Sequence, residues 1–339
     1  MRFALLAGLL LASAPAMAND TMAQLGTGGL VFVTNQDIEM VSENLSVSPE
    51  QVKVVYKFHN NSEQDQHILV AFPMPDIEGS GDFMVGIPTD DPENIFGFQT
   101  SFNGEPVDAQ LHQYAFANNI DYSDELRAMG VPLAPFGEAT LAALNGLSDA
   151  DKATLYQQGL AIPMEYDAGE GPQVDVTPVW TLRSTYSWEA VFPAGQDADV
   201  VHSYKPSVGG TVMPTFMPSS TDDGYSAEQL AAYRTKYCVD DDLSRAIKKQ
   251  GTTADGYTSY PFTESWISYV WSTGNNWSGP IGKFTLTVDK GDPANLVSFC
   301  GENVKKIGPT TFQMTANDWF APYGRELEIL LLVKNDSSQ

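Results

Sequence analysis

The chain has 339 residues, of which 43 are acidic and 18 are basic, so its formal net charge at pH 7 is −25. A negative field of that size repels nucleic acid and anionic lipid, and we therefore exclude both as partners. It suits a solvated surface, a bound cation or a basic protein. The length allows one large domain or two medium domains with sizeable cores.

The first 18 residues have the pattern of a secretory signal peptide. Arg2 supplies the positive start, the apolar stretch "FALLAGLLLASAPA" follows, and Ala16-Met17-Ala18 is a small-x-small cleavage site. The alternative is a retained anchor, but the apolar stretch is short for a span of about 20 residues. We therefore predict cleavage after Ala18, a mature chain that begins at Asn19, and a periplasmic or secreted protein with no membrane span.

Alternating apolar and polar residues predict antiparallel strands over residues 19–118, which we expect to form an N-terminal β-sandwich lobe. The clearest pair is "QVKVVYKFHN" and "HILVAFPMP", joined by a polar turn. Further strands are expected over residues 30–33, 38–47, 95–102 and 107–114, with Asn103-Gly104 as a hairpin turn between the last two.

The glycines of "GTGGLVF", residues 26–32, resemble a phosphate-binding loop at first sight. Such a loop needs a strand before it and a helix after it, and neither is predicted here. No Gly-Lys-Ser/Thr follows either. We interpret these glycines as a tight entry into the first strand.

Helical patterns interrupt the strands twice. Residues 119–170 predict a helical insertion, with Ser148 as the N-cap of one helix and Gly159 as its end. Residues 171–339 predict a C-terminal β-rich lobe with a helical segment near residues 226–250 and a last strand at "LEILLLV". The predicted fold class is mainly β, with two antiparallel β-sandwich-like lobes and helical insertions.

Cys238 and Cys300 are the two cysteines of the chain. In an exported protein an even pair is typical of a disulfide. A redox-active pair is the alternative, but the C-x-x-C spacing is missing. We predict a structural bridge that stabilises the fold by about 4 kcal/mol in the chain-entropy description.

Four segments carry a resemblance to a known family. They are "NDTMAQLGTGGLVFVTNQDIEM", "VAFPMPDIEG", "HSYKPSVGG" and "NNWSGPIGKFTLTVDKG". Over essentially the whole mature chain the sequence resembles the bacterial exported family called domain of unknown function 4424. The resemblance implies export and one family-wide architecture, and it supplies no catalytic residue. The N-terminal part, through "YKFHNNSEQDQHILVAFPMP" and "FNGEPVDAQL", also resembles the β-sandwich domain of inter-alpha-trypsin-inhibitor heavy chains, which implies an interaction module.

Catalytic and metal-binding motifs are scarce. The four histidines lack zinc-binding spacing, no G-x-S-x-G occurs, and we assign no catalytic residue. Asp240, Asp241 and Asp242 could supply hard oxygen ligands, so Ca²⁺ is the one cofactor that we consider. The same carboxylates are also favoured in the first turn of a helix by its dipole.

Trp277 lies in "NNWSGPIG", a loop where an aromatic side chain is often exposed for recognition. With Asn275, Asn276 and Tyr323 it forms our candidate contact surface, although core packing is the ordinary role of a large aromatic residue. We expect a non-catalytic binding or interaction module of the cell envelope, with an envelope protein or a glycan as partner. One alternative is a carboxylate-based hydrolase of envelope polymers. Another is a calcium-stabilised adhesin-like module.

Overall fold

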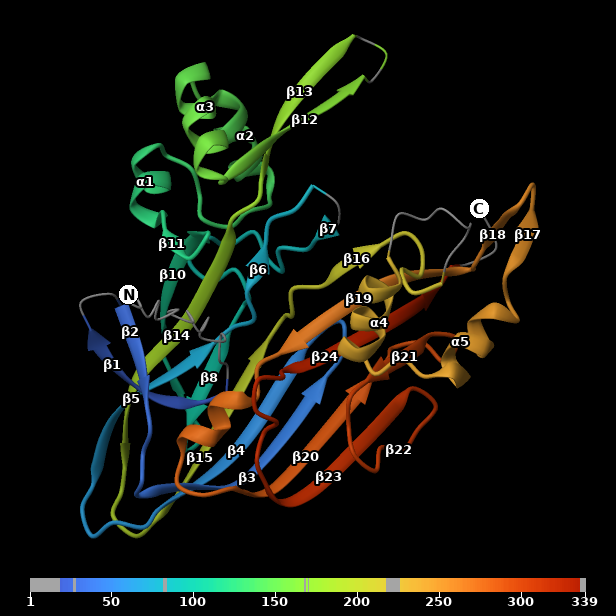
Figure 1. The fold of residues 1–339 in the computed structure, drawn as a ribbon. Coiled ribbons are helices and arrows are strands. Elements are labelled where there is room, and N and C mark those ends of the chain that lie inside the picture. Colours follow the sequence, from blue (N-terminus) through green and yellow to red (C-terminus); the bar gives the residue numbers. More distant parts are fainter. Residues whose placement is uncertain are drawn as a thin grey trace, which may run out of the picture.

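The structure is a computed structural model that describes residues 19–335 apart from 27–28, 82–83, 168, 170 and 218–225. The predicted signal peptide, residues 1–18, therefore lies outside the described residues. The fold is mainly β, as the sequence predicts, and three large sheets carry most of the strands (Figure 1).

The largest sheet has eight strands and contains a parallel pair, β3 with β20, among antiparallel neighbours. In spatial order its strands are β22 (Lys305–Lys306), β23 (Thr311–Trp319), β20 (Ile281–Asp289), β3 (Ile38–Val47), β4 (Val52–Asn60), β15 (Asp197–Tyr204), β8 (Gln99–Phe102) and β9 (Glu105–Val107).

Two further sheets pack with it. The seven-stranded sheet has the order β11 (Ile120–Asp121), β10 (Gln110–Ala117), β14 (Thr181–Phe192), β5 (Gln66–Pro73), β1 (Thr21–Gly26) and β2 (Gly29–Val33), and β6 (Ile77–Glu78) also pairs with β14. The five-stranded sheet has the order β21 (Leu296–Phe299), β24 (Leu327–Lys334), β19 (Phe262–Tyr269), β16 (Gly209–Thr211) and β7 (Met84–Val85).

The sheets do not follow the predicted division of the chain. β3 and β4 come from the first third of the sequence, yet they lie beside β15 and β20. In the same way β5 pairs with β14 over eight residue pairs, from Thr185 with Pro73 to Phe192 with Gln66. The predicted boundaries at residues 118 and 171 therefore do not separate one sheet from another. Alternation identifies a strand but carries no information about its partner.

The predicted helical insertion contains helices followed by a hairpin. It contains α1 (Ser123–Ala128), α2 (Glu138–Gly146), α3 (Asp149–Gln158) and β12 (Ala161–Asp167). The second strand of the hairpin, β13 (Pro172–Pro178), lies just beyond the predicted end of the insertion at residue 170. As predicted, Ser148 caps α3 by accepting a hydrogen bond from the Asp151 amide, and Gly159 ends it with a φ of 71°. Figure 1 shows these helices and the hairpin gathered at one end of the molecule.

The second helical segment is also present where the sequence predicts it. It contains α4 (Ala227–Lys236) and α5 (Asp241–Lys248), and Ser226 and Gln229 form a capping box at the start of α4. The short hairpin β17 (Thr252–Ala254) and β18 (Tyr257–Ser259) follows. Both helices lie beside the five-stranded sheet (Figure 1). Under them a small apolar core joins Tyr237 and Ile247 to Leu330 and Leu332 of β24.

Gly26 is the last residue of β1 and Gly29 is the first residue of β2. The two strands are antiparallel, and Gly26 pairs with Gly29. The expectation that no strand precedes the glycines was therefore wrong. β1 has only six residues, and its polar and apolar residues do not alternate clearly. A strand rather than a helix follows, so the segment is not a phosphate-binding loop.

Candidate functional site

The predicted contact surface around Trp277 is wrong, because this side chain is only 2% exposed. Its ring packs against Phe58 and Phe192, with centroids 4.8 Å and 6.1 Å away. Its indole nitrogen donates to the backbone carbonyl of Asp20. The 3₁₀ turn Ser272–Asn276 that precedes Trp277 leads this residue into the core rather than out of it.

The other three residues of that predicted surface do not form one contact surface either. Asn275 donates to the carbonyl of Ala321, and Asn276 donates to the hydroxyl of Thr21, each at 3.0 Å. Both amides therefore hold the turn in place. Tyr323 is 99% exposed. It remains a candidate contact residue, but no longer with an exposed tryptophan beside it.

The three aspartates considered for Ca²⁺ lie at the start of α5, and each has a partner. Asp240 caps the helix by accepting from the Leu243 amide at 2.7 Å. Asp241 pairs with Arg234 at 2.8 Å, and Asp242 pairs with Arg245. Among the described residues, no group of three or more acidic, histidine or cysteine side chains is arranged to hold a metal ion. Calcium binding stays a prediction that the structure does not test.

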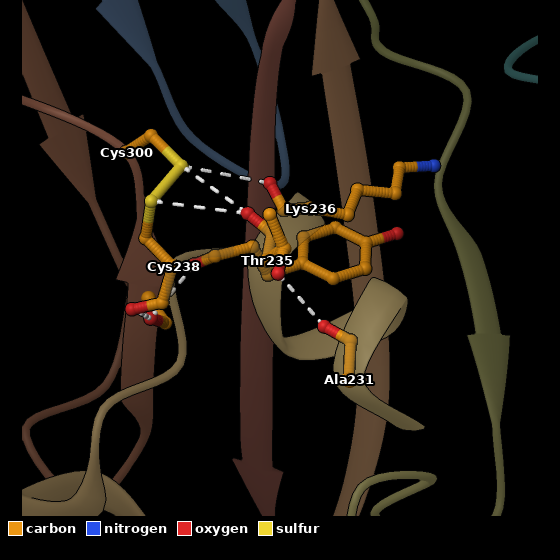
Figure 2. Close-up of a disulfide and its surroundings, with 7 residues drawn as sticks. Ala231, Thr235, Lys236, Cys238 and Cys300 are labelled. Atoms are coloured by element: carbon orange, nitrogen blue, oxygen red, sulfur yellow. Dashed lines mark hydrogen bonds between the residues drawn. A yellow bond between two sulfur atoms is a disulfide. The ribbon is translucent and has the colours of Figure 1, made fainter. Parts of the chain in front are cut away.

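The predicted disulfide between Cys238 and Cys300 is confirmed. Cys238 follows α4, and Cys300 follows β21 of the five-stranded sheet. Figure 2 shows the bridge beside the carbonyl groups of Thr235 and Lys236 at the end of α4, the second of them 3.6 Å from Cys300 Sγ. The bridge therefore ties α4 to the sheet on which it packs.

A cavity of about 560 Å³ lies between the seven-stranded and five-stranded sheets, with α4 at one side. We call it the acidic cleft. Its wall includes four carboxylates, one ammonium group and several aromatic rings. The residues used below are Asp76, Glu78, Lys236, Trp266, Glu326 and Glu328.

Local sequence places the two walls of the acidic cleft. Pro73 and Pro75 end β5, and the chain returns as β6 to pair with β14, which brings Asp76 and Glu78 to the cleft. On the other wall Gly209 of β16 lies opposite Trp266 of β19. A Cβ atom at Gly209 would lie 2.1 Å from the indole nitrogen of Trp266, so only glycine leaves room for this ring.

Most of the cleft carboxylates are held by fixed donors. Asp76 pairs with the guanidinium group of Arg183 at 3.3 Å. Burial raises the pKa of Asp76 to about 6, although the charge of Arg183 opposes the shift. Glu328 accepts a hydrogen bond from the Ser268 hydroxyl at 2.6 Å and lies 3.5 Å from the ammonium group of Lys236.

Glu326 of the wall and Glu264, which lies behind it, are also held by hydrogen bonds. Glu264 accepts from the amide and hydroxyl groups of Thr215 at 2.6 Å and 2.8 Å, and from the Tyr233 hydroxyl at 2.7 Å. Glu326 accepts from the Trp271 amide at 2.9 Å and from the Ser272 hydroxyl at 2.5 Å. Burial raises the pKa of both carboxyl groups above the ordinary value. Through its contacts with Thr215 and Tyr233, Glu264 joins the loop after β16 to α4.

A second polar group of residues lies inside the protein, at positions that were not predicted from the sequence. We call it the N-terminal cluster; its ionisable members Asp20, Glu43 and His202 have no exposed surface. His202 Nε2 lies 3.0 Å from Asp20 Oδ1, and Asn19 Nδ2 donates to Glu43 Oε2 at 3.0 Å. A signal was present in the sequence. On β3, Glu43 lies on the same strand face as Leu45, and on β15, His202 lies on the same face as Val200. Both of these faces are buried.

Comparisons with known proteins bear mainly on the family. The sequence profile of the family described as domain of unknown function (DUF4424) matches residues 18–330. The chain is also similar to a solved structure from Legionella pneumophila, described as that of a candidate nutrient binding protein, at 13% identity and a TM-score of 0.46. That similarity covers 93% of this chain and 70% of the other. Among curated proteins no relative was found.

These comparisons confirm one of the two family resemblances expected from the sequence. The likeness of the N-terminal part to inter-alpha-trypsin-inhibitor heavy chains stays a prediction, whereas the resemblance to the DUF4424 family is confirmed. None of the helices in the described ranges has the length and apolar character that a membrane crossing needs.

Proposed function

The chain belongs to the DUF4424 family, and from that premise we propose that it is an exported, non-catalytic binding module of the cell envelope. The observation that carries the proposal is the acidic cleft. Carboxylates and aromatic rings meet there in one cavity of about 560 Å³, within the usual size range of ligand sites. The signal-peptide pattern and the disulfide support export, since disulfides persist in oxidising compartments.

The chemistry of the cleft favours a ligand with a positive charge and an apolar body. Glu78 is exposed at the rim, and Glu328 and Asp76 lie deeper. The indole of Trp266 and the nearby tyrosine rings offer surfaces on which a cation or an aliphatic stem packs. Of the two partner classes expected from the sequence, we therefore favour an envelope protein that inserts basic side chains over a neutral glycan.

The hydrolase alternative finds less support in the same cleft. Such an enzyme needs a carboxyl group with a raised pKa that is free to give its proton to the substrate. The pKa values of Glu264 and Glu326 are raised, but their oxygens accept hydrogen bonds from the fold itself. Asp76 is held by Arg183. Carboxylates fixed in this way form a charged wall more readily than an acid/base pair.

The test is a titration of the protein with trilysine, followed by calorimetry at low ionic strength. Glu78→Gln is expected to weaken binding about tenfold, since it removes a rim charge that faces the cation. Glu63→Gln is the matched control, because Glu63 is exposed on the turn before β5 and away from the cleft. Equal affinity of the two variants, or equal binding of triglutamate and trilysine, would refute the proposal. Binding of a neutral chitin oligosaccharide in place of trilysine would favour the glycan.

A further inference from the structure

Asn19, Asp20 and Thr21 have no exposed surface, which is unusual for a segment at the edge of a domain. Asn19 is also the residue that the predicted cleavage after Ala18 would make the first of the mature chain. Asn19 makes hydrogen bonds to three separate parts of the fold, and these contacts fix its position inside the protein.

The side chain of Asn19 is held on every polar atom. Its amide nitrogen donates to Glu43 of β3 at 3.0 Å and to the Trp271 carbonyl at 3.3 Å. Its carbonyl oxygen accepts from the hydroxyl groups of Tyr56 on β4 and Tyr269 on β19. A Cβ atom at Gly274 would lie 2.5 Å from the Asn19 amide nitrogen, so the turn that faces Asn19 requires glycine there.

The backbone nitrogen of Asn19 also has a defined place. It donates to the hydroxyl oxygen of Thr273, which in turn donates to the Asn19 carbonyl at 2.5 Å. Thr273 has no exposed surface either. The nitrogen that cleavage would convert into an amine therefore already lies inside the protein, next to a hydrogen-bond acceptor.

The N-terminal cluster has more negative than positive groups. Among its described members, Asp20 and Glu43 can carry a negative charge and His202 a positive one. Three of their polar atoms, Glu43 Oε1, Asp20 Oδ2 and His202 Nδ1, are buried with no hydrogen-bond partner. Burial raises the pKa of Glu43 to about 8, and it also raises that of Asp20 against the opposing effect of His202. One further cation would allow both carboxyl groups to ionise and would balance their charges together with His202.

We propose that the α-amino group of Asn19, freed by signal-peptide cleavage, is a buried structural cation that docks among Glu43, Asp20 and Thr273. This inference rests on the export that forms part of the proposed function. Water hydrolyses the Ala18–Asn19 peptide bond; its oxygen joins the Ala18 carboxylate, and the freed Asn19 amine takes up a proton. A neutral amide with one N–H thereby becomes an ammonium group with three.

The consequence is that processing completes the fold. Glu43 is buried with one oxygen that has no hydrogen-bond partner, and no ion pair joins it to a lysine, arginine or histidine side chain in the part of the chain that the structure describes. After cleavage, the ammonium group supplies both a hydrogen-bond donor and the missing charge. With its pKa raised to about 8, Glu43 is largely protonated at neutral pH before cleavage, and the ammonium group would let it ionise as a paired carboxylate. The cleaved chain thereby gains stability from a buried ion pair that the uncleaved chain lacks.

The first experiment compares two purified forms of the chain. One begins at Asn19, released from a fusion by a protease that leaves no extra residue, and the other begins at Met17. We expect the Met17 form to melt at least roughly 5 °C lower. Glu43→Gln is expected to remove most of this difference, whereas Glu39→Gln should keep it, because Glu39 lies on the same strand but faces Asn61 at the surface. Equal melting temperatures of the two wild-type forms would overturn the proposal.

A second measurement does not depend on any variant. The α-amine of the Asn19 form is acetylated with an amine-reactive ester, and the N-terminal peptide is quantified by mass spectrometry. In the folded protein the reaction is expected to be on the order of 100-fold slower than in urea, since it requires local opening. The α-amine of the Met17 form is the control for an accessible terminus. Equal rates for Asn19 in the folded and unfolded protein would refute burial of the amine.

These outcomes are separate from those that test the proposed function. Both forms are made in vitro, so the docking of Asn19 is tested whether or not the cell cleaves at this bond. Mass spectrometry of the protein recovered from its own envelope tests the cleavage. The trilysine titration tests the acidic cleft.

Discussion

The imidazole Nε2 of His202 lies 3.0 Å from the carboxylate of Asp20, and neither side chain has exposed surface. The rings of Phe72, Phe98 and Trp188 surround the imidazole, with centroids 4.9 Å, 5.2 Å and 5.0 Å away. The pair joins β15 of the eight-stranded sheet to the residue just before β1 of the seven-stranded sheet. A polar link inside an aromatic core therefore connects two sheets.

Asp20→Asn is expected to lower the free energy of unfolding by about 3 kcal/mol, because it removes the buried carboxylate charge that faces His202 and leaves only an amide oxygen there. Urea unfolding followed by tryptophan fluorescence measures the change. Asp108→Asn is the control, since Asp108 is exposed and should alter stability by no more than about 0.5 kcal/mol. Equal stability of the two variants would contradict a coupled Asp20–His202 pair.

Trp277→Ala is expected to destabilise the protein by about 3–5 kcal/mol, because it empties a site between Phe58 and Phe192 and removes the donor to Asp20. Tyr323→Ala removes a fully exposed ring and should leave stability almost unchanged. Thermal unfolding of the two variants separates these effects. If Trp277→Ala melted like the wild-type protein, the assignment of this residue to the core would be incorrect.

Replacing both Cys238 and Cys300 by serine is expected to cost about 4 kcal/mol, because the bridge closes a long loop in the unfolded chain. The two cysteines are 62 residues apart in the sequence. Urea unfolding of the oxidised wild-type protein, the reduced protein and the double variant measures the effect. Reduction should have no effect on the double variant, and a loss there would point to a cause other than the bridge.

Stability should fall as the pH rises through the titration of Asp76. The folded pKa of about 6 lies above the ordinary value of 3.8, so the folded state binds more protons than the unfolded state between pH 4 and pH 6. Wild-type protein should therefore lose about 2 kcal/mol more than Asp76→Asn between pH 4 and pH 7. Urea unfolding at a series of pH values tests this. Parallel pH profiles for the two proteins would show that Asp76 titrates normally.

Binding to the cleft should show the opposite trend. An ionised Asp76 attracts a cation, so trilysine should bind more tightly as the pH rises through about 6. Asp76→Asn should bind weakly across the same range and without that step. Calorimetry at three pH values provides the measurement, with Glu63→Gln as the variant expected to keep the wild-type profile.

Local features of the fold were predictable because they depend on neighbouring residues. Alternation in "QVKVVYKFHN" identified β4, whose Val54, Tyr56 and Phe58 are all buried. The cap at Ser148 was predicted correctly for the same reason, since a cap acts within one helical turn. The disulfide followed from the number of cysteines and the expected compartment.

The candidate site could not be predicted in this way. The acidic cleft combines residues from β6, α4, β16, β19 and β24, whose arrangement depends on which strands are neighbours. Trp277 was misjudged because loop composition describes the backbone and does not reveal which way a side chain points. Glu43 was overlooked although its buried position on β3 was visible, because its partner Asn19 lies just before β1, a strand of a different sheet.

The sequence by itself determined the mainly β class, the positions of most strands and helices, the pairing of the cysteines and the resemblance to the family. Each of these depends on spacing within a short window or on the kind of residue present. Only the tertiary structure decided which strands share a sheet, that carboxylates gather in one cleft, and that Asn19 lies at the centre of a buried polar cluster. These depend on contacts between residues up to 257 positions apart, such as Asp20 with Trp277, and no local pattern records them.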